Sequence, residues 1–280
     1  MRIGSYSGLG TVQPLDKSVK SLAKTNRDLN KILERLSTAL RINRASDDAA
    51  GLGVSEMLRT QIRGFKMATR NVEDAMSALN IAEGVGNEVS QMIQRQRELA
   101  LQAASDTLTD EQRQNLNVEY QALTEEINRI TNATQFNTQP VANGTGLSSG
   151  TAQIQAGANS NEAITIPSAN MTANALLITG TSITTRESAL TALERLDNAL
   201  NTLNSQRTEL GAMTNRFEST IRNIMVSEVN TQAAESVLRD QDMAMGLAEL
   251  TRNKLLTQGT MSAFSRFREI SVNHLLGLLK

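Results

Sequence analysis

Residues 15–40 read LDKSVKSLAKTNRDLNKILERLSTAL, and their apolar side chains follow a heptad spacing. Steps of four and three residues alternate through Leu15, Val19, Leu22, Asn26, Leu29, Leu33, Leu36 and Leu40. This pattern is typical of a helix that packs against another helix along one seam. Asn26 interrupts the apolar series, and two interpretations stay open with equal weight: it fixes the register of the pairing, or it is a tolerated, surface-facing exception.

The same spacing returns three times along the chain and predicts three more long helices. Its members are Leu58, Ile62, Phe65, Thr69, Val72, Met76 and Leu79; then Leu116, Tyr120, Leu123, Ile127 and Ile130; then Leu193, Leu196, Leu200, Leu203, Arg207, Leu210, Thr214, Phe217, Ile221 and Ile224. Seams of this length predict rod-like helices that pack on one another, because each helix has an apolar stripe to bury.

The segment from residue 131 to 185 has a different composition, since Glu162 is its only charged residue. Pro140 and Pro167 interrupt any helix there. Residues 152–156 and 164–166 alternate weakly between polar and apolar, with glycine and asparagine between them. We therefore predict one or two small β-hairpins in the middle of the chain.

A second interruption lies at residues 45–53, which read ASDDAAGLG. The acidic pair and the two glycines predict a joint between two helical sections, with helix resuming near Val54. Ser46 or Asp47 is expected to cap that helix, because their side-chain oxygens accept hydrogen bonds from its unpaired amides.

The composition argues against several classes of function. Twenty-eight basic and 29 acidic residues leave a net charge of −1, which disfavours a general nucleic-acid binder. The chain has no cysteine, no tryptophan and one histidine, so thiolate metal sites, disulfides and aromatic cofactor pockets are not expected. The first thirty residues carry no apolar stretch of signal-peptide length and no run reaches transmembrane length, so we expect no membrane association and no cleaved signal.

The groups that most resemble chemical sites have simpler interpretations. The acidic pairs Asp47-Asp48 and Glu125-Glu126, and the nearby Asp240 and Asp242, have no histidine or cysteine partner and are expected to be solvated surface charge. The glycine cluster at residues 144–150 lacks the spacing and lysine of a phosphate loop, and His274 has no partner at motif spacing. We expect no catalytic residue, no cofactor, no metal and no enzymatic activity.

Residues 36–52 read LSTALRINRASDDAAGL and closely resemble a stretch of bacterial flagellin. Further matches occur, in the family's order, at residues 55–56, 59–64, 94–99, 135–137, 155–159, 210–216 and 233–244. Together they span almost the whole chain, which makes the resemblance far more specific than any single motif.

The resemblance implies a mostly α fold: long antiparallel coiled-coil helices, with terminal inner-tube helices, a three-helix outer layer and a small central β-hairpin region. The implied segments are an N-terminal inner-core helix (1–44), outer-core helices (45–138), a short hairpin and loop segment (139–185), an outer-core C-terminal helix (186–236) and a C-terminal inner-core helix (237–280). The short central segment implies a filament with little outer decoration.

By resemblance, the chain is a structural subunit that polymerises with itself into the flagellar filament used for swimming. The resemblance also implies that the chain is exported unfolded by the flagellar type III apparatus and is located outside the cell. Implied partners are an export chaperone on residues 237–280, the filament cap and the hook-junction proteins. The residues agree with this, because the seam of residues 15–40 is marginal alone and is expected to order against neighbouring subunits.

The resemblance also places Arg95, Leu99 and Glu119 at a patch that the flagellin-sensing Toll-like receptor recognises, and the same residues can serve lateral packing. The ends depart from the family: residues 4–10 replace an Asn-rich stretch, so the first helix is expected to start near Pro14, and residues 264–269 replace a small-residue run. A hook-filament junction protein and a non-polymerising soluble coiled-coil adaptor are therefore kept as alternatives.

Overall fold

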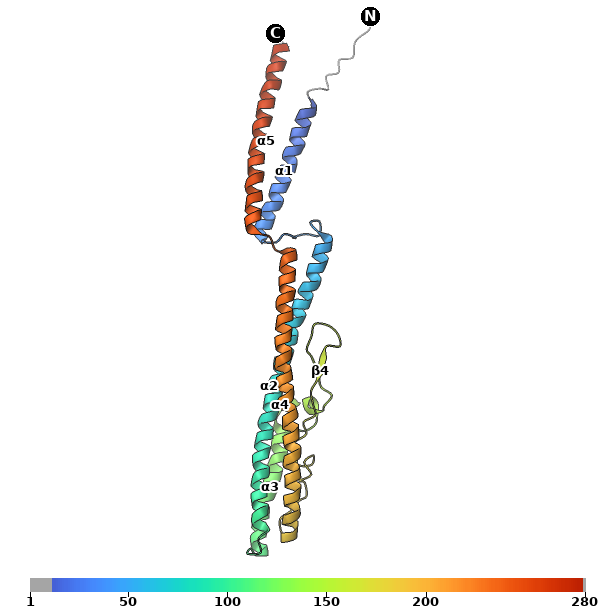
Figure 1. The fold of residues 1–280 in the computed structure, drawn as a ribbon, viewed down its shortest axis with the longest axis vertical. Coiled ribbons are helices and arrows are strands. Elements are labelled where there is room, and N and C mark those ends of the chain that lie inside the picture. Colours follow the sequence, from blue (N-terminus) through green and yellow to red (C-terminus); the bar gives the residue numbers. More distant parts are fainter. Residues whose placement is uncertain (1–11, 279–280) are drawn as a thin grey trace. The chain divides into compact units, whose positions relative to one another are not determined.

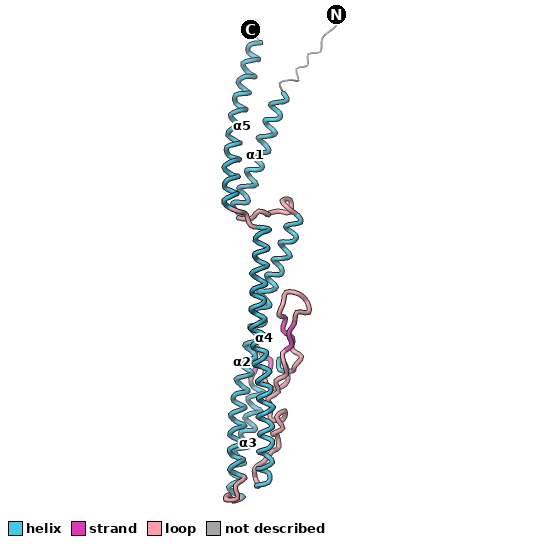
Figure 2. The backbone as a smooth tube through the Cα atoms, viewed as in Figure 1, coloured by secondary structure: helices cyan, strands magenta, loops and turns pink. Residues whose placement is uncertain are grey.

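The computed structural model describes residues 12–278, which fold mostly into long helices (Figure 1). The helices are α1 (Val12–Thr38), α2 (Ala49–Ala103), α3 (Asp110–Ala133), α4 (Arg186–Arg239) and α5 (Met243–Leu278), with a 3-10 turn, η1, at Gly146–Ser148. Two short hairpins lie between α3 and α4, formed by β1 (Gln135–Phe136) with β2 (Gln139–Pro140) and by β3 (Gln153–Gln155) with β4 (Ala163–Thr165) (Figure 2). The predicted fold class is confirmed.

The chain forms two compact units. The terminal unit comprises the residues up to Arg59 and those from Gln232 onward, and the central unit comprises Thr60–Thr231. Helices α2 and α4 contribute residues to both units. In the terminal unit α1 and α5 lie side by side and run in opposite directions (Figure 1).

The central unit is held by the seams that the sequence predicts. On α4 the buried residues recur every seven positions, at Leu196, Leu203, Leu210, Phe217 and Ile224. The first four of them meet Val72 and Leu79 of α2 and Tyr120 and Ile127 of α3 in one continuous apolar core. The remaining apolar members of these three seams are half-buried. Those that pack against this core are Met76, Leu116, Leu123, Ile130, Leu193, Leu200 and Ile221. Because two or more seams face one another here, each stripe finds a partner within the chain.

The irregular chain between the second hairpin and α4 is fixed by amide side chains of the helices. Asn128 Oδ1 accepts a hydrogen bond from the Ala173 amide at 3.0 Å, and Asn117 Oδ1 accepts one from the Ile183 amide at 3.0 Å. Gln121 Nε2 donates to the Thr181 carbonyl at 2.6 Å. These hydrogen bonds satisfy backbone groups that have no strand partner. This irregular segment can therefore be buried without secondary structure of its own.

The hairpin of β3 and β4 confirms the one predicted, with Ile154 opposite Ile164. The sequence allowed for a second hairpin, but it did not locate the hairpin of β1 and β2. This hairpin turns through Asn137 and Thr138, whose φ angles of 48° and 65° are those of the mirror-image turns that suit two-residue hairpins. Asn137 was the available signal, because asparagine tolerates this left-handed conformation, but the strands are too short to show alternation.

The joint between α1 and α2 differs from its prediction in two respects. Helix α2 begins at Ala49, before both glycines, rather than near Val54. The capping residue is Asp48, whose Oδ1 accepts from the Gly51 amide at 2.8 Å, and not Ser46 or Asp47. A capping residue directly precedes the first residue of its helix. Because the predicted start of the helix was wrong, the predicted capping residue was wrong as well. Helix α1 starts at Val12 and holds Pro14 in its first turn, where proline is tolerated.

Candidate assembly surfaces

The contact between α1 and α5 is close, but few of the α5 residues in it are large and apolar. The α5 residues that lose exposure recur at heptad spacing: Gly246, Leu250, Asn253, Thr257, Thr260 and Phe264. A Cβ atom at Gly246 would lie 2.8 Å from Leu36 Cδ2, so the glycine allows the two helices to approach at this end. The pairing therefore buries few large apolar side chains.

The predicted inner-core seam is divided by this pairing. Leu22, Leu29, Leu36 and Leu40 are half-buried, whereas Val19, Asn26 and Leu33 are exposed. The side chain of Leu15 lies outside the residues whose burial is described. Ile32 is the most buried described residue of α1 and was missed, although it lies within one helical turn of both Leu29 and Leu36. One partner helix thus covers half of the seam and leaves the other half open.

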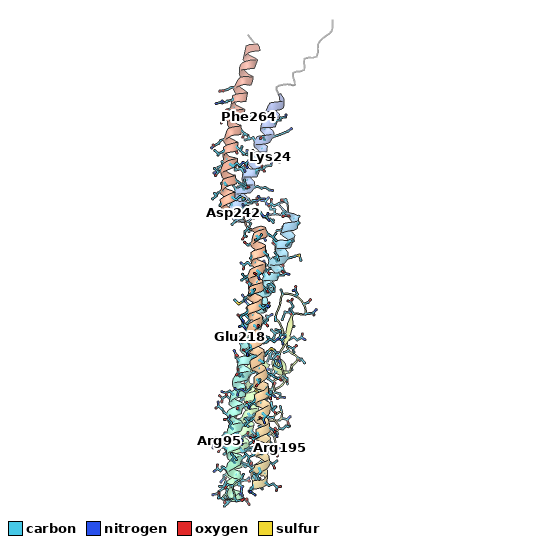
Figure 3. The ribbon with its side chains drawn as sticks, in the orientation of Figure 1. Lys24, Arg95, Arg195, Glu218, Asp242 and Phe264 are labelled. Carbon is cyan, nitrogen blue, oxygen red and sulfur yellow. The ribbon has the colours of Figure 1, made fainter. Side chains whose placement is uncertain are left out.

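Helix α5 carries a second open apolar surface. Met243, Met245, Leu247, Leu255, Leu256 and Met261 are exposed, Leu255 at 63%. Side chains of α5 project away from α1 as well as toward it (Figure 3). Asp242 caps the helix, because its Oδ1 accepts from the amides of Ala244 and Met245 at 2.9 and 3.1 Å. Exposed apolar side chains in such number along one helix indicate a surface that binds another chain.

Hydrogen bonds join the segment that follows α1 to the segment that connects α4 with α5. The Arg41 amide donates to the Arg239 carbonyl at 2.6 Å, and the Gln241 amide donates to the Ala39 carbonyl at 3.0 Å. Arg239 also forms an ion pair with Glu56 at 2.9 Å. Hydrogen bonds from Arg239, followed by those from Arg59, lower the pKa of the Glu56 carboxyl. These contacts tie the end of α1 to the start of α5.

Asp47 anchors the same joint from the other side. Its carboxylate lies 2.9 Å from Lys31 Nζ and accepts from the Arg44 amide at 3.2 Å. The hydrogen bond from Lys31 is the main reason that the pKa of the Asp47 carboxyl is lowered. The nearby Arg44 pairs with Glu34 of α1 at 2.9 Å. The acidic pair Asp47-Asp48 thus has two separate tasks, anchoring and helix capping.

The three residues of the predicted receptor or lateral-packing patch do not all reach the surface. Arg95 Nε donates to Glu119 Oε1 at 2.9 Å, and Arg95 also pairs with Glu98 at 3.0 Å. Glu119, and then Glu98, raise the pKa of the Arg95 guanidinium. Leu99 is 1% exposed and packs in the core of the central unit. A partner would therefore contact Arg95 and Glu119, with Leu99 supporting them from below.

Residues 12–278 contain no cluster of three or more histidine, cysteine or carboxylate side chains close enough to share a metal ion. Within the same part of the chain, every helix is too short or too polar to cross a lipid bilayer.

Comparison with known families matches both ends of the chain. Residues 12–146 match the bacterial flagellin N-terminal helical region, and residues 193–278 match the bacterial flagellin C-terminal helical region. The two regions include all five long helices except the start of α4. They carry both open apolar surfaces of α1 and α5.

Whole-length relatives agree with these matches. The chain is 42% identical to a flagellin of Halalkalibacterium halodurans, over 84% of this chain and 86% of the relative. It is 37% identical to a flagellar filament 30.7 kDa core protein of Treponema maltophilum, over 88% and 91%. A solved structure from Vibrio parahaemolyticus, proposed to be a flagellar hook-associated protein, shares the fold with a TM-score of 0.57, covering 69% of this chain and 99% of that one at 16% identity.

Proposed function

This chain belongs to the bacterial flagellin family and is a structural subunit of the flagellar filament, and we propose that α1 and α5 are the elements through which it assembles. Self-polymerisation is what the family implies. The observation that supports the role of the terminal helices is their open apolar surface: Val19 and Leu33 on α1, and the exposed methionines and leucines on α5.

The energetics favour ordering of these helices on assembly. Full burial of one leucine side chain contributes roughly 1.5–3 kcal/mol, whereas ordering each backbone residue costs about 1–2 kcal/mol. Among the described residues of the terminal unit, Ile32 and Ile42 are the buried apolar side chains. The helix pair is thus marginal by itself, and neighbouring subunits supply the burial that it lacks.

A single charge on α5 tests this proposal. Leu255→Asp places a carboxylate on the open apolar surface, and Gln258→Asp, at another exposed position of α5, is the matched control. We expect both variants to melt like the unchanged chain as monomers. With filament seeds, electron microscopy should show filaments for the unchanged chain and the control but not for Leu255→Asp.

Two outcomes of that experiment contradict the proposal. Normal filaments from Leu255→Asp would place the assembly contact elsewhere. A full chain that stays a folded monomer with seeds would favour the non-polymerising coiled-coil adaptor. That adaptor and the hook-filament junction protein are not favoured, because flagellins and filament core proteins match over most of their length.

The same open surface supports a proposal for export. We propose that the chain passes unfolded through the flagellar type III apparatus, reaches the outside of the cell without a cleaved signal, and is met there by the filament cap and hook-junction proteins. A secreted protein with an intact mass of 30.4 kDa is the expected result. A shorter product would show that a leader is removed.

An export chaperone is proposed to cover residues 237–280 before secretion, because α5 exposes the longest apolar surface of the terminal unit. A chain that ends at residue 236 should lose the chaperone complex. A complex that survives this truncation would refute the assignment.

A flagellin-sensing Toll-like receptor is a further proposed partner, through Arg95 and Glu119. Arg95→Ala should lower receptor activation by the monomer, whereas Arg129→Ala should not, although Arg129 is also an exposed arginine paired with a glutamate of its own helix. Equal activation by both variants would leave lateral packing as the role of Arg95.

A further inference from the structure

Leu177 has an unusual backbone and an unusually exposed side chain. Its φ angle is +58°, in the left-handed region that disfavours bulky residues. It follows a helical turn, where the Ile178 amide donates to the Ala173 carbonyl at 3.0 Å and the Leu177 amide donates to the Asn174 carbonyl at 3.1 Å. This bond pair is the Schellman motif, in which the left-handed position is usually glycine.

A leucine at this position carries a steric cost that a glycine would avoid. Its side chain is 73% exposed, while the flanking Leu176 and Ile178 are buried in the core of the central unit. Two buried anchors hold the turn rigid and direct an apolar side chain into solvent. Strained residues that a rigid surrounding structure maintains cluster at functional sites. The exposed, strained Leu177 is therefore a candidate contact residue.

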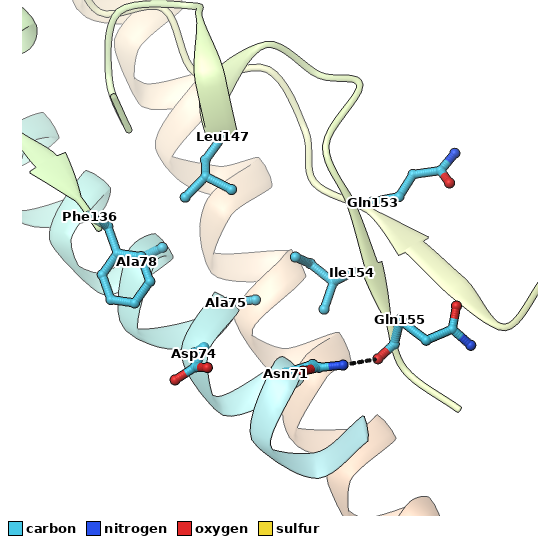
Figure 4. Close-up of a pocket in the computed structure, with 9 residues that line it drawn as sticks. All are labelled: Asn71, Asp74, Ala75, Ala78, Phe136, Leu147, Gln153, Ile154 and Gln155. Carbon is cyan, nitrogen blue, oxygen red and sulfur yellow. Dashed lines mark hydrogen bonds between the residues drawn. The ribbon is translucent and has the colours of Figure 1, made fainter. Parts of the chain in front are cut away.

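The same unit contains an open groove with an apolar floor. Its volume is about 340 Å³, and its apolar walls are Ala75 and Ala78 of α2, Phe136 of β1, Leu147 of η1 and Ile154 of β3 (Figure 4). At one end Asn71 Nδ2 donates to the Gln155 carbonyl at 3.3 Å, which fixes the hairpin against α2. The groove is thus held open by ordered elements.

The groove suits a neutral apolar side chain. Asp74 is the charged residue of its lining, and the loop that carries Leu177 brings no charge to it, because residues 163–185 contain none. The hollows of the terminal unit are a poorer match, because charged side chains such as Arg35, Asp47 and Asp48 line them.

We propose that Leu177 of one subunit inserts into this groove of a neighbouring subunit. The inference rests on the proposed self-assembly and adds to it a specific contact between central units. A knob and a groove at different places on one chain make a head-to-tail contact, which repeats from subunit to subunit and suits an open polymer rather than a closed pair.

Paired cysteines test the contact, since the chain has no cysteine of its own. The variant Leu177→Cys with Leu147→Cys is assembled, checked for filaments by electron microscopy and mildly oxidised. We expect a ladder of covalent oligomers in filaments and none in dilute monomer, because a disulfide requires Cβ atoms about 3.5–4.5 Å apart. The control pair Leu147→Cys with Leu190→Cys replaces another exposed leucine, on α4, and should give no ladder.

Each result of the cross-linking decides the question. Filaments of the Leu177/Leu147 pair without a ladder overturn the proposed contact but leave self-assembly intact. A ladder from Leu177→Cys alone also overturns the proposed contact, because it shows that residue 177 of one subunit lies next to residue 177 of another. An unchanged chain that forms no filaments contradicts the proposed function itself.

A second variant separates a binding role from a structural one. Leu177→Gly removes the side chain and relieves the backbone, so the monomer should melt at an equal or higher temperature. Its critical concentration for assembly should rise about tenfold or more, whereas Leu190→Ala should change it less than twofold. A lower melting temperature with unchanged assembly would show that Leu177 serves only its own fold.

Discussion

The two units of this molecule use similar sequence patterns and reach opposite results. In the central unit, the seams of α2, α3 and α4 face one another and bury large side chains such as Tyr120 and Phe217 completely. In the terminal unit, α1 packs against α5, whose facing residues include few large apolar side chains, and among described residues only Ile32 and Ile42 become buried apolar side chains. A heptad pattern indicates that a helix has an apolar stripe to bury. Whether that stripe is buried within one chain depends on how many other helices of the same chain face it.

This difference separates stability from assembly. The central unit contains its own core and is expected to fold alone, whereas the terminal unit leaves apolar side chains exposed, and we propose that neighbouring subunits cover them. Substitutions of similar side chains should therefore have different effects in the two units. The following predictions compare them, beginning with the largest effect.

Removing a core side chain from the central unit should have the largest effect on the monomer. Phe217→Ala should lower the free energy of unfolding by about 3–5 kcal/mol, because Phe217 is fully buried and leaves a cavity. Leu255→Ala in the terminal unit should change it by less than about 0.5 kcal/mol, because the side chain is mostly exposed. Urea denaturation measures both, and equal losses would remove the distinction between the units.

The buried phenol of the central unit should give a smaller effect and a dependence on alkaline pH. Tyr120 Oη lies 2.7 Å from Thr181 Oγ1, and Tyr120→Phe should cost about 1 kcal/mol in unfolding free energy. Burial raises the pKa of the Tyr120 phenol above its usual value of about 10. The unfolded chain ionises first, so stability should be full below about pH 10 and fall above it. Tyr120→Phe should flatten this decline in alkaline denaturation curves.

Replacing two glycines of α5 by alanine should show which part of the helix packs closely against α1. Gly259 has open space where a Cβ would be, so Gly259→Ala should raise the helix content and stability of α5 by about 0.5–1 kcal/mol. Gly246→Ala should not, because the new methyl group meets Leu36. Circular dichroism during heating compares them, and an equal gain from both would show that α1 and α5 do not make close contact near Gly246.

The smallest effect should come from acid at the joint of the terminal unit. The pKa of Asp47 is lowered in the folded chain, chiefly by Lys31. Its contribution is therefore present above the unfolded pKa of about 4 and is lost as pH falls through the lower folded value. Hydrogen exchange at the Arg44 amide should accelerate in that acidic range, and Asp47→Asn should make it fast at neutral pH. Exchange that stays slow in Asp47→Asn would show that the joint does not depend on this carboxylate.

Sequence reasoning was strongest where a pattern extends over many residues. The seam on α4 includes Leu196, Leu203, Leu210, Phe217 and Ile224, and all of them are buried in the structure. The hairpin of β3 and β4 was also predicted, because its strands alternate and glycine and asparagine lie between them. The hairpin of β1 and β2 was not located, because strands of two residues are too short to show an alternating pattern.

The candidate surfaces were only partly predictable, for a related reason. Periodicity shows which residues share one face of a helix but not which neighbour covers that face. Leu99 was placed in a surface patch with Arg95 and Glu119, yet it is buried. Leu177 gave no signal, because a left-handed backbone at a leucine follows from the turn that Leu176 and Ile178 anchor rather than from its own preference.

The sequence by itself determined the helical class, the place of the irregular middle segment and, through its resemblance to flagellin, the kind of assembly the chain builds. Those features depend on the spacing and type of residues, and both can be read from positions that are close together in the sequence. Only the tertiary structure decided that the central seams are covered and the terminal ones left half open, that Asp48 is the cap, and that Leu177 is exposed in a unit that also contains an apolar groove. Burial depends on what packs against a residue, and most of those neighbours are distant in the sequence.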